Sequence, residues 1–264
     1  MVHGDALLAA YDREVRPAET APPPPGAHAE RDGPLVRLVG QHRGFVSPPP
    51  DLRVRGAALD ALIARQRDFF AARGEAVEWK ARSHDRPRDI GRRLIAAGFV
   101  PEAPEAVMIG VAAEMAGHDA PLPTGVGVRQ TADETDMRRI AAMESAVWGE
   151  ALGWLADDLI GRSRARPDQI AVLVAEAGDA VVSAAWLVHR PGTAFAALWG
   201  GSTVAPWRGR GIYRHLVTER ARLAVARGVR YLQVDASDQS RPVLERLGFV
   251  AVTTTTPYVW TPPA

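Results

Sequence analysis

The chain has 264 residues, 47% of them hydrophobic, and this length allows two domains of ordinary size. Its 32 basic and 31 acidic residues give a formal net charge of +1, so bulk charge attracts neither nucleic acid nor an anionic membrane. The absence of cysteine excludes disulfides, thiolate metal sites and a cysteine acyl-enzyme. We expect a cytoplasmic protein with no nucleic-acid or membrane partner, because no apolar run is long enough to span a bilayer.

Two residue types limit the chemistry further. Lys80 is the only lysine, so a lysine nucleophile is not expected, and arginine does not serve as a general base at neutral pH. The seven histidines show no tight ligand spacing. The sequence therefore predicts no metal site.

Residues 1–34 predict an N-terminal helix and a proline-rich spacer. Apolar and charged residues are spaced as in a short helix over residues 5–16, and Pro17 is expected to end it. The run Pro22–Pro25 is typical of a stiff polyproline connection.

The rest of the chain predicts two α/β domains, at residues 35–117 and 126–264, joined by a linker rich in proline and glycine at residues 118–125. In the first domain, strands are expected at residues 35–39, 44–46, 76–81 and 106–111, and helices at residues 59–70 and 87–97. In the second domain, strands are expected at residues 126–130, 170–176, 180–189, 195–203, 230–234 and 253–260, and helices at residues 133–148, 152–164, 212–225 and 240–247. The order of elements in the second domain predicts a mixed sheet.

The chain is organised around Thr203–Tyr213, where an apolar strand ends, turns through glycines and becomes an amphipathic helix. Gly209 and Gly211 lack Cβ atoms, so the backbone can adopt positive φ and approach a ligand closely. The helix points unpaired N–H groups and its positive dipole end at the turn, and Arg208 and Arg210 add two charges. This combination predicts a phosphate or pyrophosphate site rather than a turn of solvated arginines.

The two halves contain a short, gapped repeat. Residues 72–100 contain Ala-Arg-Gly, a strand, a proline, a helix and Gly-Phe-Val, and residues 226–250 contain the same series. Where the second half has the glycine-rich turn, the first has Pro48–Pro50, and prolines lack the N–H donors of an anion cradle. Only the second half is therefore expected to hold a phosphate-bearing ligand. A chance likeness of two α/β patterns is the alternative explanation of the repeat.

Two separated motifs resemble the GNAT superfamily of acetyl-CoA-dependent N-acetyltransferases. The first is Arg208–Gly211 at the start of a helix, and the second is Leu244–Phe249. The resemblance covers about residues 124–260 and implies a GNAT-like mixed central sheet flanked by helices. It also implies that residues 35–117 form a degenerate, partial GNAT-like domain, as in tandem proteins of the family.

In that family the amides of the turn hold the pyrophosphate of acetyl-CoA, and the preceding strand end pairs with pantetheine. The resemblance assigns these roles to Thr203, Val204, Arg208, Gly209, Arg210, Gly211, Ile212 and Tyr213. The family usually has glycine or alanine where Tyr213 stands. The pair Gly200-Gly201 is consistent with a bulge that makes room for pantetheine, and an early strand end is the alternative.

The residue inventory and the resemblance imply direct attack of an amine on the thioester in a ternary complex. The family often protonates the leaving thiolate with a tyrosine, and Leu244 occupies that position here. The acid role then passes to Ser240, to another group or to solvent. Glu144, Asp235 and His189 are candidate bases by placement alone, and a structural role is the alternative for each.

We therefore expect an N-acetyltransferase that uses acetyl-CoA as co-substrate and an unidentified amine of a small molecule or peptide as acceptor. The alternative is a catalytically inactive acyl-CoA sensor, favoured by Leu244 and by the degenerate first half. The tryptophans expected near the acceptor, as core or as an aromatic pocket, are Trp148, Trp154, Trp186 and Trp199. No motif identifies the acceptor or the oligomeric state.

Overall fold

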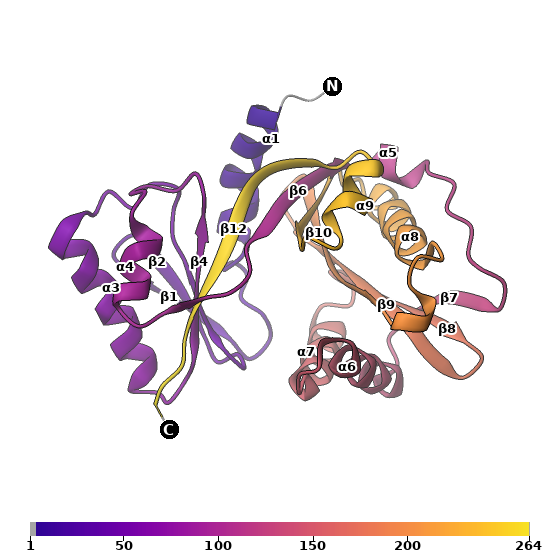
Figure 1. The fold of residues 1–264 in the computed structure, drawn as a ribbon, viewed down its shortest axis with the longest axis horizontal. Coiled ribbons are helices and arrows are strands. Elements are labelled where there is room, and N and C mark those ends of the chain that lie inside the picture. Colours follow the sequence, from indigo (N-terminus) through magenta and orange to yellow (C-terminus); the bar gives the residue numbers. More distant parts are fainter. Residues whose placement is uncertain (1–3, 264) are drawn as a thin grey trace. The chain divides into compact units, whose positions relative to one another are not determined.

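The computed structural model describes residues 4–263, which divide into two compact units (Figure 1). The first unit comprises residues 4–108, Asp235–Pro242 and residues 251–263, and the second comprises Ile109–Val234 and Val243–Val250. Among the described residues, no helix is both long and apolar enough to cross a lipid bilayer.

The first unit is built on a sheet in which β3 and β4 are parallel and the other paired strands are antiparallel. In sheet order its strands are β1 (His28–Asp32), β2 (Leu35–Val39), β3 (Gly44–Ser47), β4 (Val77–Arg82) and β12 (Val250–Trp260), and β5 (Val100–Pro101) also pairs with β12. Its helices are α1 (Gly4–Ala10), the π-helix η1 (Tyr11–Val15), α2 (Arg16–Ala18), α3 (Gly56–Ala71) and α4 (Ile90–Ala96).

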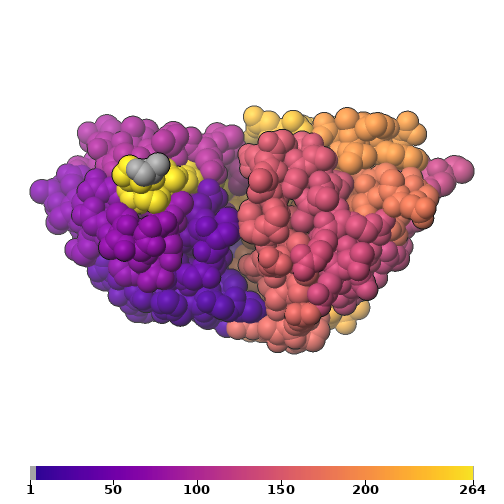
Figure 2. Space-filling view, turned by 90° about the horizontal axis from the view of Figure 1, so that it is seen from below, coloured from indigo at the N-terminus to yellow at the C-terminus, as the bar shows by residue number. Residues whose placement is uncertain are grey.

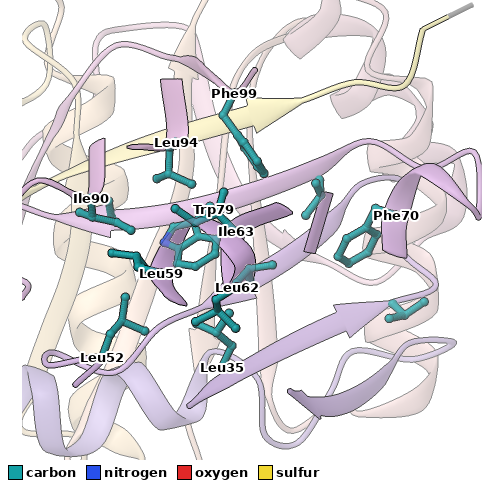
Figure 3. Packing of buried hydrophobic residues seen from close by; sticks show 14 residues of the cluster. Leu35, Leu52, Leu59, Leu62, Ile63, Phe70, Trp79, Ile90, Leu94 and Phe99 are labelled. Atoms are coloured by element: carbon teal, nitrogen blue, oxygen red, sulfur yellow. The ribbon is translucent and has the colours of Figure 1, made fainter. Parts of the chain in front are cut away.

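The core of the first unit lies between α3 and the sheet. Helical spacing brings Leu59, Ile63 and Phe70 to one face of α3, where all three are fully buried. Figure 3 shows the indole of Trp79, on β4, beside Leu59 and Ile63. The last strand is part of this unit, because residues 255–260 of β12 pair with β4, and Figure 2 shows the yellow C-terminal residues surrounded by the purple residues of the first unit.

The second unit contains a sheet with helices on both faces. Its strands are β11 (Tyr231–Ala236), β10 (Phe195–Thr203), β9 (Ala180–His189), β8 (Ile170–Ala177) and β7 (Val126–Thr131), in sheet order, and β6 (Glu105–Val111) leads into the unit. Its helices are α5 (Ala112–Ala116), α6 (Glu134–Trp148), α7 (Gly153–Ala165), the 3-10 turn η2 (Ala205–Trp207), α8 (Ile212–Ala226) and α9 (Arg241–Arg246). Only the β10–β11 pair is parallel among the pairs from β7 to β11.

The strand β8 explains why both faces of the second sheet carry helices. Val172 and Val174 pack with the cluster under α6 and α7, whereas Leu173 and Ala175 pack with Leu216 of α8. A strand buried on both faces reads as a continuous apolar run, as β8 does. The expected mixed sheet flanked by helices is therefore confirmed.

The internal repeat has a counterpart in hydrogen bonding. After α3 and after α8, three successive backbone N–H groups return to the same relative carbonyls of the last helical turn. The donors are Arg73, Gly74 and Glu75 in the first unit and Arg227, Gly228 and Val229 in the second. The ends of α4 and α9 match as well, since Phe99 donates to the carbonyl of Leu94 and Phe249 to that of Leu244.

Several details differ from the sequence-based expectations. Pro17 does not end the first helical segment, which continues through α2 to Ala18. Residues 28–32, expected in a spacer, form β1 against β2, and residues 112–116 form α5. The chain passes from the first compact unit to the second between Met108 and Ile109, within β6, and changes unit again after Val234, Pro242 and Val250.

Candidate functional site

The turn between β10 and α8 has the backbone conformation that the glycines predict. Gly209 and Gly211 have φ values of 73° and 89°, in the left-handed region that L side chains rarely adopt. Gly211 is the N-cap of α8, and no side chain caps this helix end. The first N–H groups of α8 are therefore not used by a capping side chain and point at the turn.

The two arginines of the turn differ in role. Arg208 donates from Nε to the carbonyl oxygen of Thr203 at 2.8 Å, so it fastens the turn to the end of β10. The guanidinium of Arg210 lies 4.9 Å from the centre of the Trp207 ring and is otherwise exposed. Ile212 anchors the start of α8 in the core, where its side chain is 1% exposed. The turn is thus fixed on both sides and positively charged.

Strand β10 separates from β11 before it reaches this turn. The two strands pair only through Phe195–Ala197, and on its other edge β10 pairs with β9 as far as Thr203. A bulge interrupts the β9 pairing between Gly200 and Ser202, and Gly200 and Gly201 both have positive φ. The expected bulge is present, and within the described residues the β11 edge of β10 is left without a strand partner after Ala197.

A buried carboxyl group lies beside this bulge. Glu144, on α6, is 3% exposed, and its Oε2 accepts a hydrogen bond from Nε1 of Trp148 at 3.0 Å. The same indole N–H also reaches Oγ of Ser202, at 3.0 Å. Oε1 of Glu144 is buried and has no hydrogen-bond partner among the described residues. Burial raises the pKa of Glu144, so this carboxyl binds a proton more readily than an exposed glutamate.

The other candidate catalytic residues are placed differently. The carboxylate of Asp235 forms an ion pair with Nζ of Lys80 inside the first unit. Ser240 donates to the carbonyl of Ser237 at 3.3 Å in the loop before α9, also in the first unit. These contacts give Asp235 and Ser240 structural partners.

His189 lies far from the bulge along β9, and Leu244 has no group that can donate a proton. His189 pairs with Ala196 at one end of the β9–β10 ladder, whereas the bulge lies at the other end. Burial lowers the pKa of the His189 imidazole. Leu244 is fully buried and accepts the backbone N–H of Phe249 that closes α9, so this position offers no proton donor.

Three tryptophans of the second unit are unusually exposed. Trp148, Trp199 and Trp154 are 60%, 50% and 39% exposed, and the first two lie next to the bulge in sequence or by contact. Trp186, in contrast, packs with the cluster under α6 and α7. Exposed aromatic rings that are not covered by the fold are typical of ligand surfaces.

The sequence predicts Glu144 on a helix but does not indicate that its side chain is buried. The sequence does contain one indication, because Glu144 and Trp148 are four residues apart on the helix and the indole N–H of Trp148 can donate a hydrogen bond to the carboxylate.

No group of three histidine, aspartate or glutamate side chains arranged to hold a metal occurs among residues 4–263.

Comparison with known families gives a match over the centre of the second unit. Residues 135–249 match the acetyltransferase (GNAT) family. A comparison with curated proteins finds no significant match.

Solved structures with the same fold cover both units. A GCN5-related N-acetyltransferase from Kribbella flavida is 14% identical, with a TM-score of 0.66 over 99% of this chain and 95% of that one. A tandem GNAT protein from the clavulanic acid biosynthesis pathway is 15% identical, with a TM-score of 0.63 over 98% and 96%. A GCN5-related N-acetyltransferase from Sphaerobacter thermophilus is 17% identical, with a TM-score of 0.59 over 89% and 83%. At these identities the likeness establishes the fold.

Proposed function

We propose, from the premise that residues 135–249 are an acetyltransferase domain of the GNAT family, that this protein transfers an acetyl group from acetyl-CoA to an amine. The acceptor is an amine of a small molecule or peptide, and both substrates are bound together. The observation that carries the proposal is the unpaired edge of β10, which leads directly into the glycine turn of α8.

The residues present fit coenzyme A along its length. The turn from Arg208 to Tyr213 supplies backbone N–H groups, the positive end of α8 and two guanidinium groups for the pyrophosphate. Pantetheine contains two amides, which can pair with the free edge of β10 as far as Thr203, as a neighbouring strand would; the N–H of Val204 instead donates to the carbonyl of Val182 on β9 at 3.0 Å. No Cβ fills the space at Gly209, where nothing lies within 4 Å of the Cβ position.

Glu144 is the proposed base. Its unpartnered Oε1 accepts the proton that the amine loses as nitrogen attacks the thioester carbonyl, and its raised pKa favours that transfer. A backbone N–H on the free edge of β10 stabilises the developing oxyanion. The C–N bond forms, the C–S bond breaks, and the proton taken up by Glu144 passes through water to the leaving thiolate, which restores the carboxylate.

A second candidate function is an acyl-CoA sensor that does not turn over its ligand. The full burial of Leu244, where the resemblance expects an acid, favours this alternative. The two candidates share the coenzyme site and differ only in chemistry.

The test combines the protein with acetyl-CoA and a panel of primary amines, polyamines and peptide N-termini. Mass spectrometry of the amines and release of free thiol report the transfer. Enzyme-dependent acetylation of an amine supports the proposal. Binding of acetyl-CoA with no acetylated product from any member of the panel favours the sensor instead.

A further inference from the structure

Two aromatic rings close on the bulge of β10 from different elements. A Cβ atom built on Gly200 would lie 2.5 Å from the Trp186 ring, and one built on Gly201 would lie 2.6 Å from the Tyr213 ring. Real Cβ atoms are not found so close to other atoms, so neither position has room for a single methyl group. The diglycine is therefore required by the rings, and a ring lies directly against each glycine of the bulge.

Both rings are held in place. Trp186 packs with the buried cluster under α6 and α7, and Tyr213 is half-buried in the first turn of α8. The guanidinium of Arg220, which is 1% exposed, ties the surrounding elements together through backbone carbonyls. It donates to the carbonyls of Leu216, Trp199 and Trp186, at 2.9, 3.0 and 3.4 Å.

Arg220 also fixes the environment of Tyr213. No carboxylate lies within ion-pairing distance of the Arg220 guanidinium in the described part of the chain. Burial lowers the pKa of Arg220 to about 10, and the neighbouring Tyr213 phenol opposes that shift. Tyr213 thus lies beside a buried guanidinium that three backbone carbonyls hold in place.

We propose that Tyr213, acting against Trp186, limits the acyl group of the donor to a short chain such as acetyl. This inference rests on the proposed function, because it places the thioester at the bulge, upstream of the turn along the free edge of β10. A longer acyl chain would have to displace one ring. Trp186 packs against the buried cluster under α6 and α7, whereas Tyr213 lies beside the glycine turn at the start of α8, so the barrier at Tyr213 decides chain length.

The test measures calorimetric affinities of CoA, acetyl-CoA and hexanoyl-CoA, which require no knowledge of the acceptor. The wild type is expected to bind CoA and acetyl-CoA alike and hexanoyl-CoA at least about tenfold more weakly, since overpacking a filled site opposes binding. Tyr213→Ala keeps the turn amide and removes the ring, so its affinity for hexanoyl-CoA should come within about twofold of that for acetyl-CoA. Tyr213→Phe keeps the ring and should keep the discrimination.

Tyr258→Ala in the first unit is the matched control and should discriminate as the wild type does. Equal wild-type affinity for acetyl-CoA and hexanoyl-CoA would overturn the inference while leaving the coenzyme site intact. Unchanged discrimination in Tyr213→Ala, with native circular dichroism, would overturn it as well. Failure of the wild type to bind CoA itself would instead remove the proposed function, and the inference with it.

Discussion

The strands β3 and β10 are equivalent in the two units, and they diverge at the same point. Each pairs with its parallel neighbour through three residues, Gly44–Val46 with β4 and Phe195–Ala197 with β11. Beyond that pairing, the first unit continues into Pro48–Pro50 and the second into Gly200-Gly201. Proline has no N–H, whereas glycine keeps it and allows close approach. The second unit therefore has a strand edge whose N–H groups can bind a ligand, and the first unit has no equivalent edge.

The helices after these strands also match. Gly56 at the start of α3 and Gly211 at the start of α8 have φ values of 57° and 89°. A buried polar side chain in each helix donates to the carbonyl four residues before it: Gln66 to that of Leu62, and Arg220 to that of Leu216. A left-handed residue at a helix start is thus shared by both units, and what distinguishes the second is the strand edge before it.

The largest expected effect comes from the carboxyl group at the bulge. Glu144→Gln removes the base without changing shape, and kcat for acetyl transfer should fall by about 100-fold or more. In the wild type, kcat/KM should rise with pH through a pKa above the ordinary 4.5 of a glutamate, because only the ionised form accepts the proton. This rise of kcat/KM with pH should be absent in Glu144→Gln.

The matched control is Glu105→Gln, which changes a partly buried carboxyl group of the first unit. It should leave kcat unchanged. A Glu144→Gln enzyme with wild-type kcat would show that the buried carboxyl group is only structural.

The next effect concerns the buried ion pair of the first unit. Asp235→Asn leaves the ammonium of Lys80, which is 9% exposed, without its counter-charge. The free energy of unfolding should fall by about 3–5 kcal/mol. Asp60→Asn, which breaks an exposed pair with Arg93, should cost less than about 1 kcal/mol. Equal urea midpoints for the two variants would contradict a structural role for Asp235.

The smallest effect is a pH dependence of stability in the first unit. Burial, with the nearby Asp235 charge, raises the pKa of Glu105 to about 7. The folded state then holds this proton more tightly than the unfolded state, so its stabilising contribution is complete below pH 4.5 and is lost as pH rises to 7. Between pH 5 and pH 8, unfolding free energy should drop by about 2 kcal/mol more in the wild type than in Glu105→Gln. Parallel pH curves for the two proteins would contradict this origin.

Local patterns in the sequence predict most elements and the turn, because periodicity and glycine chemistry act over a few residues. Asp133 illustrates this, since its side chain accepts the N–H of Thr135 at 2.7 Å and caps α6, a role that aspartate commonly takes at a helix start. The strand β1 escapes prediction, because His28–Asp32 is mostly polar and takes its form from pairing with β2.

Local sequence patterns do not predict contacts between residues that are far apart in the chain. The pairing of β12 with β4 and the ion pair of Asp235 with Lys80 join segments more than a hundred residues apart. Glu144 and Ser202, which lies in the bulge, likewise share the indole N–H of Trp148 although they are far apart in the sequence. The sequence therefore predicts the backbone part of the site, which is the glycine turn, but not the buried side chain of Glu144.

Coenzyme binding at the glycine turn is tested most directly by calorimetric measurement of CoA affinity for the wild type, Gly211→Glu and Gly56→Glu. Both substitutions place the same charge and Cβ on a left-handed residue at a helix start. We expect Gly211→Glu to weaken CoA binding by about 100-fold, since its carboxylate repels the pyrophosphate, and Gly56→Glu to bind CoA as the wild type does. Equal affinities for all three proteins would contradict the claim that the second unit alone holds the coenzyme at its glycine turn.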